Sequence, residues 1–276
     1  MEVSEQEAKL RLRLAQIERN EACQTNFLTF VKNMWPEFIA GRHHKIISEK
    51  LERVATGELK RLIINMAPRH TKSEFASFLF PAWMMGKNPK MKIIQATHTT
   101  ELAVNFGRKT KNLIDSDDYK EIFPEVRLAA DSKASGRWDT ASGGMYYAVG
   151  VGSNLAGRGG DLVIIDDPHS EQTAMSANGF DDAWDWYTGG PRQRLQPGGS
   201  IVLVQTRWSE KDMTGQLLRA MAKDPLADQW EVVELPAIFD DGKPCWPEFW
   251  NLEDLTAVKA SIPPSKWNAQ YQQNPK

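Results

Sequence analysis

The sequence contains few cysteines, no long apolar run and almost no net charge. Its two cysteines, Cys23 and Cys245, lie far apart without CxxC or Cys/His spacing, so we expect neither a zinc site nor a disulfide framework. No apolar run is long enough to span a membrane, and the first residues lack the apolar segment of a secretory signal. We therefore expect a cytoplasmic protein without membrane contact.

The charge balance gives no global reason to bind nucleic acid. The formal net charge is -2, with 25% charged and 41% hydrophobic residues, which is the composition of an ordinary globular protein. Any contact with DNA must therefore come from a local basic surface. At 276 residues the chain is long enough for one large domain with appendages.

Apolar strands alternate with helical segments through the middle of the chain. Continuous apolar strands separated by helices are typical of a sheet that is buried on both faces. We therefore predict an α/β fold with a mostly parallel sheet. The predicted strands are 61–65, 92–96, 145–149, 162–165, 201–204 and 231–233. The predicted helices between them include 73–85, stopped by Gly86, and 100–114.

The two ends of the chain differ from this middle region. Residues 1–26 form a predicted helical extension, in which charged residues interleave with Leu10, Leu12, Leu14 and Ile17. This pattern is typical of a helix that is exposed or binds a partner. Residues 27–235 form the predicted α/β domain. Residues 236–276 lose the strands and contain a predicted helix at 252–260, so we expect a small appended subdomain or linker there.

A candidate phosphate-binding loop follows the first strand. In the segment MAPRHTKS, Lys72 and Ser73 stand where a P-loop places its lysine and its magnesium-binding hydroxyl. The two glycines of that motif are missing, because Met66 and Thr71 occupy their positions. A threonine at the second position implies an altered loop geometry. The short match TKS can also arise by chance, so by itself it does not identify a phosphate-binding loop.

Paired carboxylates end a later apolar strand. The run LVIIDD closes on Asp166 and Asp167. Strand-end acids of this kind place one carboxylate on a magnesium ion and another where it can orient a water. We predict that Asp166 holds the metal and that Asp167 is the general base. The alternative is a pair of acids that merely caps a buried strand, but two strand-end motifs in the expected order are much more specific than one.

Three further segments carry polar residues that could reach a phosphate. The strand 201–204 ends in Gln205, Thr206 and Arg207, and ligands of α/β sheets lie at the carboxyl ends of strands. A structural turn is the alternative there. The glycine-rich segment 150–160 carries Arg158, which could reach a phosphate of its own or of a neighbouring chain. A flexible loop with a solvated arginine is equally consistent with it.

The third segment, 189–199, is framed by glycines and is predicted to be a loop. It carries two arginines that suit contacts with the DNA backbone, and the alternative is an ordinary solvated loop. These candidate DNA-binding residues are Arg192 and Arg194.

Taken together, these segments resemble a known family. The runs LIINMAPRHTKS, KIIQATHTTELAVNFGRK, LAGRGGDLVIIDDPHSEQ and GPRQRLQPGGSIVLVQTRWSEKD resemble, in this order, the ATPase domain of tailed-bacteriophage terminase large subunits. The resemblance extends from about Phe27 to the end of the chain. It implies a P-loop NTPase fold of the ASCE type followed by a lid or linker subdomain, with ATP and Mg²⁺ as cofactors.

The resemblance also implies roles for individual residues. Ser73 and Asp166 would hold Mg²⁺, and Asp167 would be the catalytic carboxylate, with Glu171 as a possible substitute. The ATP phosphates would be bound by Arg69, His70, Thr71, Lys72 and Ser73. Gln205 and Thr206 match the motif that couples the γ-phosphate to movement, Arg158 matches an arginine that acts on the neighbouring subunit, and His43 resembles a residue near the adenine pocket.

The family implies a motor that drives double-stranded DNA into a capsid from the host cytoplasm, docked on the viral procapsid. Its implied partners are a portal protein, a small terminase subunit and further copies of the chain in a ring of five, with a monomer in isolation. The chain ends before the acidic cluster of the family's nuclease domain, so we expect no DNA cleavage. The alternatives are a related helicase, which needs a second motor domain, and a regulatory module that binds nucleotide without turnover.

Overall fold

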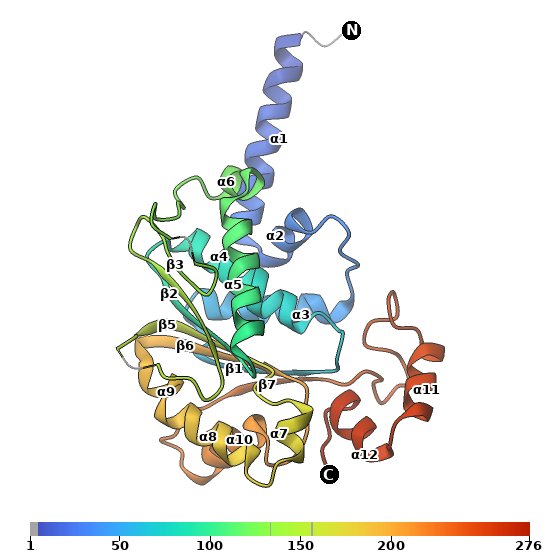
Figure 1. Ribbon diagram of the computed structural model, residues 1–276. Helices are drawn as coiled ribbons and strands as arrows, with labels where there is room; N and C mark the ends of the chain where they lie inside the picture. The colour runs from blue at the N-terminus through green and yellow to red at the C-terminus, as the bar shows by residue number, and fades with distance from the viewer. Residues whose placement is uncertain (1–4, 133, 156) are drawn as a thin grey trace.

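The centre of the molecule is a twisted sheet (Figure 1). The computed structural model describes residues 5–132, 134–155 and 157–276. Residues 1–4 of the predicted extension and Ala156 of the glycine-rich segment lie outside the described residues. Within the described ranges the sheet has seven strands in the order β3-β4-β2-β5-β6-β1-β7. The strands are β1 (Arg61–Met66), β2 (Lys92–Thr97), β3 (Arg137–Asp139), β4 (Met145–Gly150), β5 (Gly160–Asp166), β6 (Leu195–Gln205) and β7 (Glu231–Leu235).

The predicted α/β fold with a mostly parallel sheet is confirmed. Every neighbouring pair of strands is parallel except β3 and β4, which are antiparallel. All six predicted strands are present, and the short edge strand β3 was not predicted. Parallel strands need crossover connections, and the helices between them supply these. No helix in the described part of the chain is both long and apolar enough to cross a membrane.

Helices cover both faces of the sheet. Figure 1 shows α2, α3, α4 and α5 on one face and α7, α8, α9 and α10 on the other. The helices on and beyond the first face are α1 (Glu5–Thr25), α2 (Phe27–Met34), α3 (Arg42–Ala55), α4 (Phe80–Lys87), α5 (Thr100–Asp115) and α6 (Asp117–Ile122). Those on the second face are α7 (Glu171–Met175), α8 (Gly179–Gly189), α9 (Pro191–Arg194) and α10 (Met213–Lys223).

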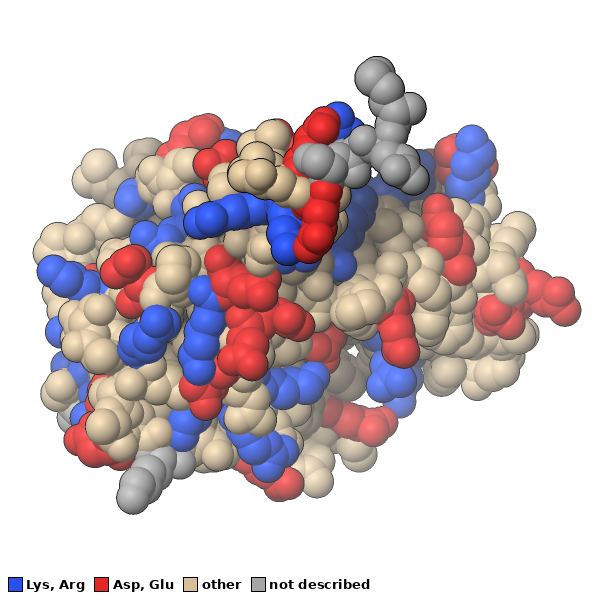
Figure 2. Space-filling view, turned by 90° about the horizontal axis from the view of Figure 1, so that it is seen from above, with Lys and Arg blue, Asp and Glu red and all other residues tan. Residues whose placement is uncertain are grey.

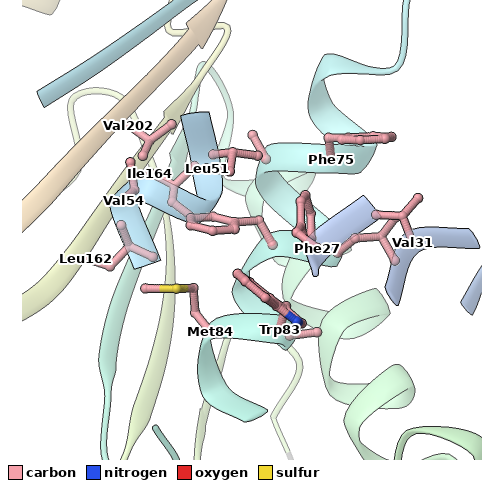
Figure 3. Close-up of a cluster of buried hydrophobic side chains, with 14 of the residues drawn as sticks. Phe27, Val31, Leu51, Val54, Phe75, Trp83, Met84, Leu162, Ile164 and Val202 are labelled. Carbon is pink, nitrogen blue, oxygen red and sulfur yellow. The ribbon is translucent and has the colours of Figure 1, made fainter. Parts of the chain in front are cut away.

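Two hydrophobic cores follow from the alternation of side chains along the strands. Leu162, Ile164 and Val202 point to the first face, where Figure 3 shows them with Phe27 of α2 and Trp83 of α4. The intervening strand residues point to the second face and form the other core with α8 and α10; they are Ile63, Ile94, Val163, Ile165, Ile201 and Leu203. The sheet is thus buried on both faces, which fixes its strand ends as rigid supports for polar residues.

Two local predictions were wrong. The predicted helix 73–85 is present, with a π-helical segment, η1 (Glu74–Leu79), before α4, but it does not stop at Gly86, because α4 continues to Lys87. Gly86 lies inside the helix because the Phe123 ring packs against it, 2.5 Å from where a Cβ would stand. The predicted loop 189–199 is instead α9 followed by the first part of β6, which pairs with β5 across a register shift between Gly160 and Leu162.

Helix α1 projects from the body of the molecule (Figure 1). Its leucines at 10, 12 and 14 and Ile17 are exposed, so the predicted exposed helix is confirmed over the described residues. Its carboxyl-terminal end is attached to α6, where Asn20 and Gln24 donate hydrogen bonds to the carbonyls of Glu121 and Ile122 at 2.9 and 2.6 Å.

The last forty residues pack beside the phosphate loop. They contain α11 (Leu252–Ser261), α12 (Pro264–Lys266) and a π-helical turn, η2 (Trp267–Tyr271). Their small core joins Ala237, Leu255 and Trp267 to Ala67, which belongs to the loop itself. The segment after the sheet therefore rests directly on the candidate phosphate site.

Candidate functional site

The candidate site lies where three strands end side by side. In the sheet, β6 separates β5 from β1, so the carboxyl ends of these strands bring Asp166, Thr206 and the loop after Met66 to one edge. A cavity of about 960 Å³ opens there, and its lining includes Lys72, Ser73 and Asp167. The volume falls within the usual range for ligand-binding pockets.

The loop between β1 and η1 has an unusual backbone. Arg69 has a φ of 60° and Thr71 a φ of 70°. Left-handed φ values are uncommon for residues with a side chain, and most unusual for a β-branched residue. Thr71 therefore keeps the conformation that a glycine would adopt at its position. A left-handed conformation is therefore present at position 71 without a glycine.

Lys72 and Asp167 contact each other across this cavity. The Lys72 ammonium lies 3.0 Å from Asp167 Oδ2, and the side chains are 7% and 28% exposed. Asp167 Oδ1 accepts a hydrogen bond from the backbone N–H of Thr206 at 2.8 Å. Asp167 has a φ of 41°, so it too occupies a strained conformation that its two contacts hold in place. The two strongest sequence candidates thus meet at one point.

Asp166 lies deeper and is surrounded by hydroxyl groups. Its Oδ1 accepts from Ser73 Oγ at 3.0 Å, and its Oδ2 accepts from Ser77 Oγ at 2.6 Å. Burial, followed by the neighbouring Asp167 carboxylate, raises the pKa of Asp166 to about 7. A carboxyl group in such a position is stabilised in its charged form by a cation.

The donors around Asp166 fit a magnesium ion. Mg²⁺ takes oxygen ligands and is commonly held by one or two protein groups together with substrate phosphates and water. Ser73 supplies a hydroxyl and Asp166 a buried carboxylate. Within the described ranges, no group of three or more His, Cys, Asp or Glu side chains could hold a metal ion. Ser73 and Asp166 are therefore the residues that could hold Mg²⁺ here, with phosphate oxygens as further ligands.

Several predicted site residues do not reach the cavity in the described structure. Gln205 is fully buried, and its Nε2 donates to Thr214 Oγ1 at 2.7 Å. His43 is fully buried behind the loop, with Nε2 3.4 Å from the carbonyl of His70. The guanidinium carbon of Arg158 lies 4.2 Å from the centre of the Tyr147 ring. Thr206, which follows Gln205 in the chain, does line the cavity.

Glu171 and Arg207 each have a partner elsewhere. Glu171 lines the rim of the cavity, but its carboxylate is 66% exposed and lies 3.1 Å from the Lys266 ammonium. Arg207 is buried and forms an ion pair with Asp212 at 2.9 Å. This pair ties the end of β6 to the start of α10, so Arg207 has a structural partner in place of a phosphate.

The two arginines suggested for DNA binding lie on α9. Arg192 donates two hydrogen bonds to the Asp228 carboxylate at 2.6 and 3.2 Å, and Arg194 is half-buried. Figure 2, which views the molecule from the side of α1, shows Lys and Arg interspersed with Asp and Glu over that face. A DNA contact by Arg192 and Arg194 stays a prediction.

The structure brings other residues to the site that the sequence did not indicate. His98 Nδ1 lies 3.1 Å from the carbonyl of Asp167, and Lys109 of α5 lies 2.8 Å from Glu74 at the cavity rim. Three aromatic residues, Trp35, Trp246 and Phe249, line an apolar wall. Trp250 Nε1 donates to the carbonyl of Arg69 at 3.3 Å. These residues come from segments that are far apart in the sequence, so no local sequence motif predicts that they lie at the site.

Comparison with solved structures identifies the fold. The HK97 bacteriophage large terminase superposes with a TM-score of 0.61 over 91% of this chain, at 13% sequence identity. The chain has the fold of a phage large-terminase ATPase domain. An ATPase-domain mutant of the Thermus phage P74-26 large terminase gives a TM-score of 0.57 at 14% identity, covering 89% of this chain and 97% of that domain.

The large terminase of a thermophilic bacteriophage in complex with ADP gives a TM-score of 0.50 at 11% identity, covering 81% of this chain and 52% of that one. The chain also spans only 55% of the length of the HK97 large terminase. No family model and no curated protein sequence matches the chain. The likeness to the terminase ATPase domains is thus one of fold, and the roles of single residues rest on the geometry described above.

Proposed function

We propose that the chain is the ATP-hydrolysing motor domain of a phage terminase large subunit, which powers translocation of double-stranded DNA into the procapsid. The observation that carries the proposal is the meeting of Lys72 and Asp167 at 3.0 Å, beside the contact of Ser73 with Asp166 at 3.0 Å. A lysine and hydroxyl after one strand and two carboxylates after another are the groups that phosphoryl transfer requires. The terminase ATPase fold and the ADP complex of the thermophilic-phage terminase support a nucleotide at this place.

Binding of ATP begins with an exchange of partners at Lys72. The loop backbone from Arg69 to Thr71 supplies N–H groups, and Lys72 supplies the charge that phosphates require. When a phosphate draws the Lys72 ammonium away, Asp167 loses its counter-ion but keeps the hydrogen bond from Thr206 N–H. The freed Oδ2 can then orient a water and accept its proton as that water attacks the γ-phosphate. Binding of the nucleotide thus frees the carboxylate that acts as the general base.

Ser73 and Asp166 would hold a magnesium ion, and such an ion would supply positive charge next to the transferring phosphoryl group. Asp166 reaches that position because Ser77 holds its second oxygen, and Ser77 in turn accepts from Gln95 Nε2 at 2.9 Å. This chain of hydrogen bonds runs from β2 through η1 to the end of β5. The deep acid is therefore oriented by groups that never touch the nucleotide.

The aromatic wall suits the nucleotide base. Trp35, Trp246 and Phe249 offer flat apolar surfaces on the loop side of the cavity, and bases stack on such rings. Trp246 and Phe249 stack on each other with centroids 4.5 Å apart, and both belong to the segment after the sheet. We assign this segment the role of a lid over the base. The proposed division of the chain is an extension at 1–26, a motor domain at 27–235 and a lid or linker at 236–276.

The remaining parts of the proposal concern assembly. We propose that the motor acts as a ring of five chains docked on the procapsid in the host cytoplasm, with a portal protein and a small terminase subunit as partners. Arg158 would act on a neighbour's nucleotide, and Arg192 and Arg194 remain the candidates for contact with the DNA backbone. These assignments rest on the fold likeness and on the sequence patterns.

Replacement of the loop lysine tests the central claim. Lys72→Ala is expected to reduce ATP turnover at least a hundredfold, because the loop loses the cationic side chain that is directed at Asp167 and the phosphates. Turnover is measured by phosphate release with and without Mg²⁺, and the circular dichroism spectrum verifies the fold. A matched control is Lys45→Ala, an exposed lysine of α3 that lies 3.9 Å from Glu49.

Three results would contradict parts of the proposal. Near-normal hydrolysis by folded Lys72→Ala removes the phosphate-loop assignment. ATP binding by the wild-type chain without any turnover, even in an assembled ring, favours a regulatory module. Stronger stimulation by single-stranded than by linear double-stranded DNA favours the helicase alternative.

A further inference from the structure

A buried histidine lies against the threonine that replaces the loop glycine. His44 Nε2 lies 2.7 Å from Thr71 Oγ1, 27 positions along the chain. His44 belongs to α3, which is otherwise a helix of the first core, and it takes no part in the proposed reaction. The contact joins a core helix to the residue whose φ of 70° is the least expected in the loop.

The direction of the hydrogen bonds can be assigned from the neighbouring groups. His44 Nδ1 accepts from the backbone N–H of Gly41 at 2.8 Å, so the single ring proton of a neutral imidazole is on Nε2. Nε2–H then donates to Thr71 Oγ1. The Thr71 hydroxyl proton is directed elsewhere, to the carbonyl of His70 at 2.5 Å. Three consecutive hydrogen bonds therefore run from the start of α3 into the phosphate loop.

His44 is itself held in one orientation. Its side chain is fully buried, and its ring stacks on Phe75 with centroids 4.8 Å apart. The rings of Phe38 and His44 form an edge-to-face pair with centroids 4.6 Å apart. Burial, followed by the proximity of His43, lowers the pKa of His44 to about 2. The imidazole stays neutral at any pH at which the protein would work, so the donor on Nε2 is permanent.

We propose that His44 is a positioning residue of the phosphate-binding loop, which uses its Nε2–H bond to hold Thr71 in the left-handed conformation that a glycine would otherwise supply. Without this bond, Thr71 is free to relax toward negative φ. That rotation turns the peptide units on either side of Thr71 and redirects the backbone N–H groups that face the phosphates. The inference rests on the proposed function, because it names what shapes the nucleotide site.

The proposal makes His44 and Thr71 depend on each other. A glycine at position 71 adopts positive φ without help, so His44 is needed only while residue 71 carries a side chain. His44→Leu is expected to weaken ATP affinity roughly tenfold in the wild-type background, the scale of one lost hydrogen bond. In a Thr71→Gly background the same substitution is expected to weaken it by no more than about twofold. His44→Leu is expected to lower the melting temperature in both backgrounds, because the buried ring packs on Phe75 in either, and to lower it less with glycine at position 71, where no hydrogen bond is lost.

A second pair of variants leaves α3 untouched. Thr71→Val keeps the side-chain volume but removes the hydroxyl, and is expected to match His44→Leu in ATP affinity. Thr71→Ser keeps the hydroxyl and is expected to bind ATP several-fold more tightly than Thr71→Val. This pair keeps the test available if His44→Leu does not fold.

The readouts are the ATP dissociation constant from titration, the turnover rate and the melting temperature of each variant. An equal loss of affinity from His44→Leu with threonine and with glycine at position 71 would show that His44 only supports the core, and equal affinities of Thr71→Val and Thr71→Ser would overturn the role of the hydroxyl. Failure of the wild-type chain to bind ATP is a different result, because it overturns the proposed function itself.

Discussion

Asp167 is held by two groups, of which Lys72 changes its partner in the proposed reaction and the Thr206 N–H keeps it. Lys72 contacts Oδ2 and the Thr206 N–H contacts Oδ1. Because Thr206 follows β6 directly, any displacement of Asp167 is transmitted to the end of that strand. Glu171, the other carboxylate considered as the base, instead lies at the rim and is paired with Lys266. Position and burial therefore favour Asp167.

Isosteric amides separate the two carboxylates. Asp167→Asn is expected to bind ATP with nearly wild-type affinity but to lose hydrolysis by about 10²–10⁴-fold, the usual contribution of a general base. Glu171→Gln is expected to retain turnover within about twofold, because its carboxylate is largely exposed. Single-turnover phosphate release and nucleotide titration measure the two effects. Normal hydrolysis by Asp167→Asn together with its loss in Glu171→Gln would transfer the role of base to Glu171.

Some residues of the site could be predicted from sequence and others could not. Lys72, Ser73, Asp166 and Asp167 follow strand ends, and parallel strands bring such positions together whatever the loops do. Ser77 also carried a signal, because it lies one helical turn after Ser73 and so shares its face. His44 carried none that a single sequence reveals.

The missed and displaced residues depend on packing between distant segments. His44 reaches Thr71 only because α3 packs against the loop, and Arg158 contacts Tyr147 because β4 lies beside the glycine-rich segment. Gln205 is the last residue of β6, but Thr214 of α10 binds its amide. A strand end predicts the neighbourhood of a side chain, and the helix packed against it decides where the side chain points.

At the scale of elements, the apolar runs predict the strands correctly, whereas glycines led to two wrong predictions, a helix end and a loop. Five of the six predicted strands lie inside the sheet and only β7 is at an edge, so most of the apolar runs are unambiguous. Gly86 suggests a helix end, yet it lies inside α4 at the place where the Phe123 ring packs against the backbone. Gly198 and Gly199 suggested a loop, but β6 extends through them because Leu195 and Ser200 pair with β5. Glycine marks a close approach or a bulge as readily as a break.

Helix α3 buries two neighbouring histidines, which makes the stability of the fold depend on pH. Burial, and next the proximity of His70, lowers the pKa of His43 to about 4, and that of His44 is lowered to about 2. In the unfolded chain both titrate near their ordinary pKa of about 6.5. Their contribution to stability is therefore fully present above about pH 6.5 and falls with decreasing pH, down to about pH 4 for His43 and to still lower pH for His44.

The expected result is a fall in the free energy of unfolding of about 1.4 kcal/mol per pH unit for each of these histidines between about pH 6 and pH 4. Urea denaturation at a series of pH values measures the slope. His44→Leu is expected to reduce the slope by about one proton, although it lowers stability overall. Identical slopes for wild type and His44→Leu would mean that His44 is not the source of this dependence.

At the scale of the whole molecule, Arg158 lies away from the nucleotide cavity of its own chain. In the described structure Arg158 rests on the Tyr147 ring, and it is not among the residues that line its own nucleotide cavity. It lies between Gly157 and Gly159 in a segment after β4, so it could be displaced toward another chain. An arginine supplied by a neighbour stabilises charge on the transferring phosphoryl group. In a ring each chain would then complete the site of the next.

The isolated chain is accordingly expected to be a slow ATPase whose turnover per chain rises with protein concentration or assembly, by on the order of a thousandfold at saturation. Arg158→Ala is expected to bind ATP normally without this acceleration, and Arg158→Lys to recover only part of it, because lysine lacks the planar guanidinium fork. Tyr147→Leu is the matched control, since it removes the resting contact but leaves the arginine. It is expected to assemble and accelerate normally.

Mixing two inactive variants decides between action within one chain and action across an interface. Arg158→Ala has an intact Asp167, whereas Asp167→Asn has an intact Arg158. In a randomly mixed ring about a quarter of the interfaces join the intact base of one chain to the intact arginine of the next. Equimolar mixtures are therefore expected to recover up to about a quarter of wild-type acceleration, measured by phosphate release after light scattering has established co-assembly. Mixed rings that assemble but remain as slow as either variant alone would show that Arg158 acts on its own site or on none. Such rings contain sites with an intact base beside an intact arginine of the next chain, and they lack only a chain that carries both residues.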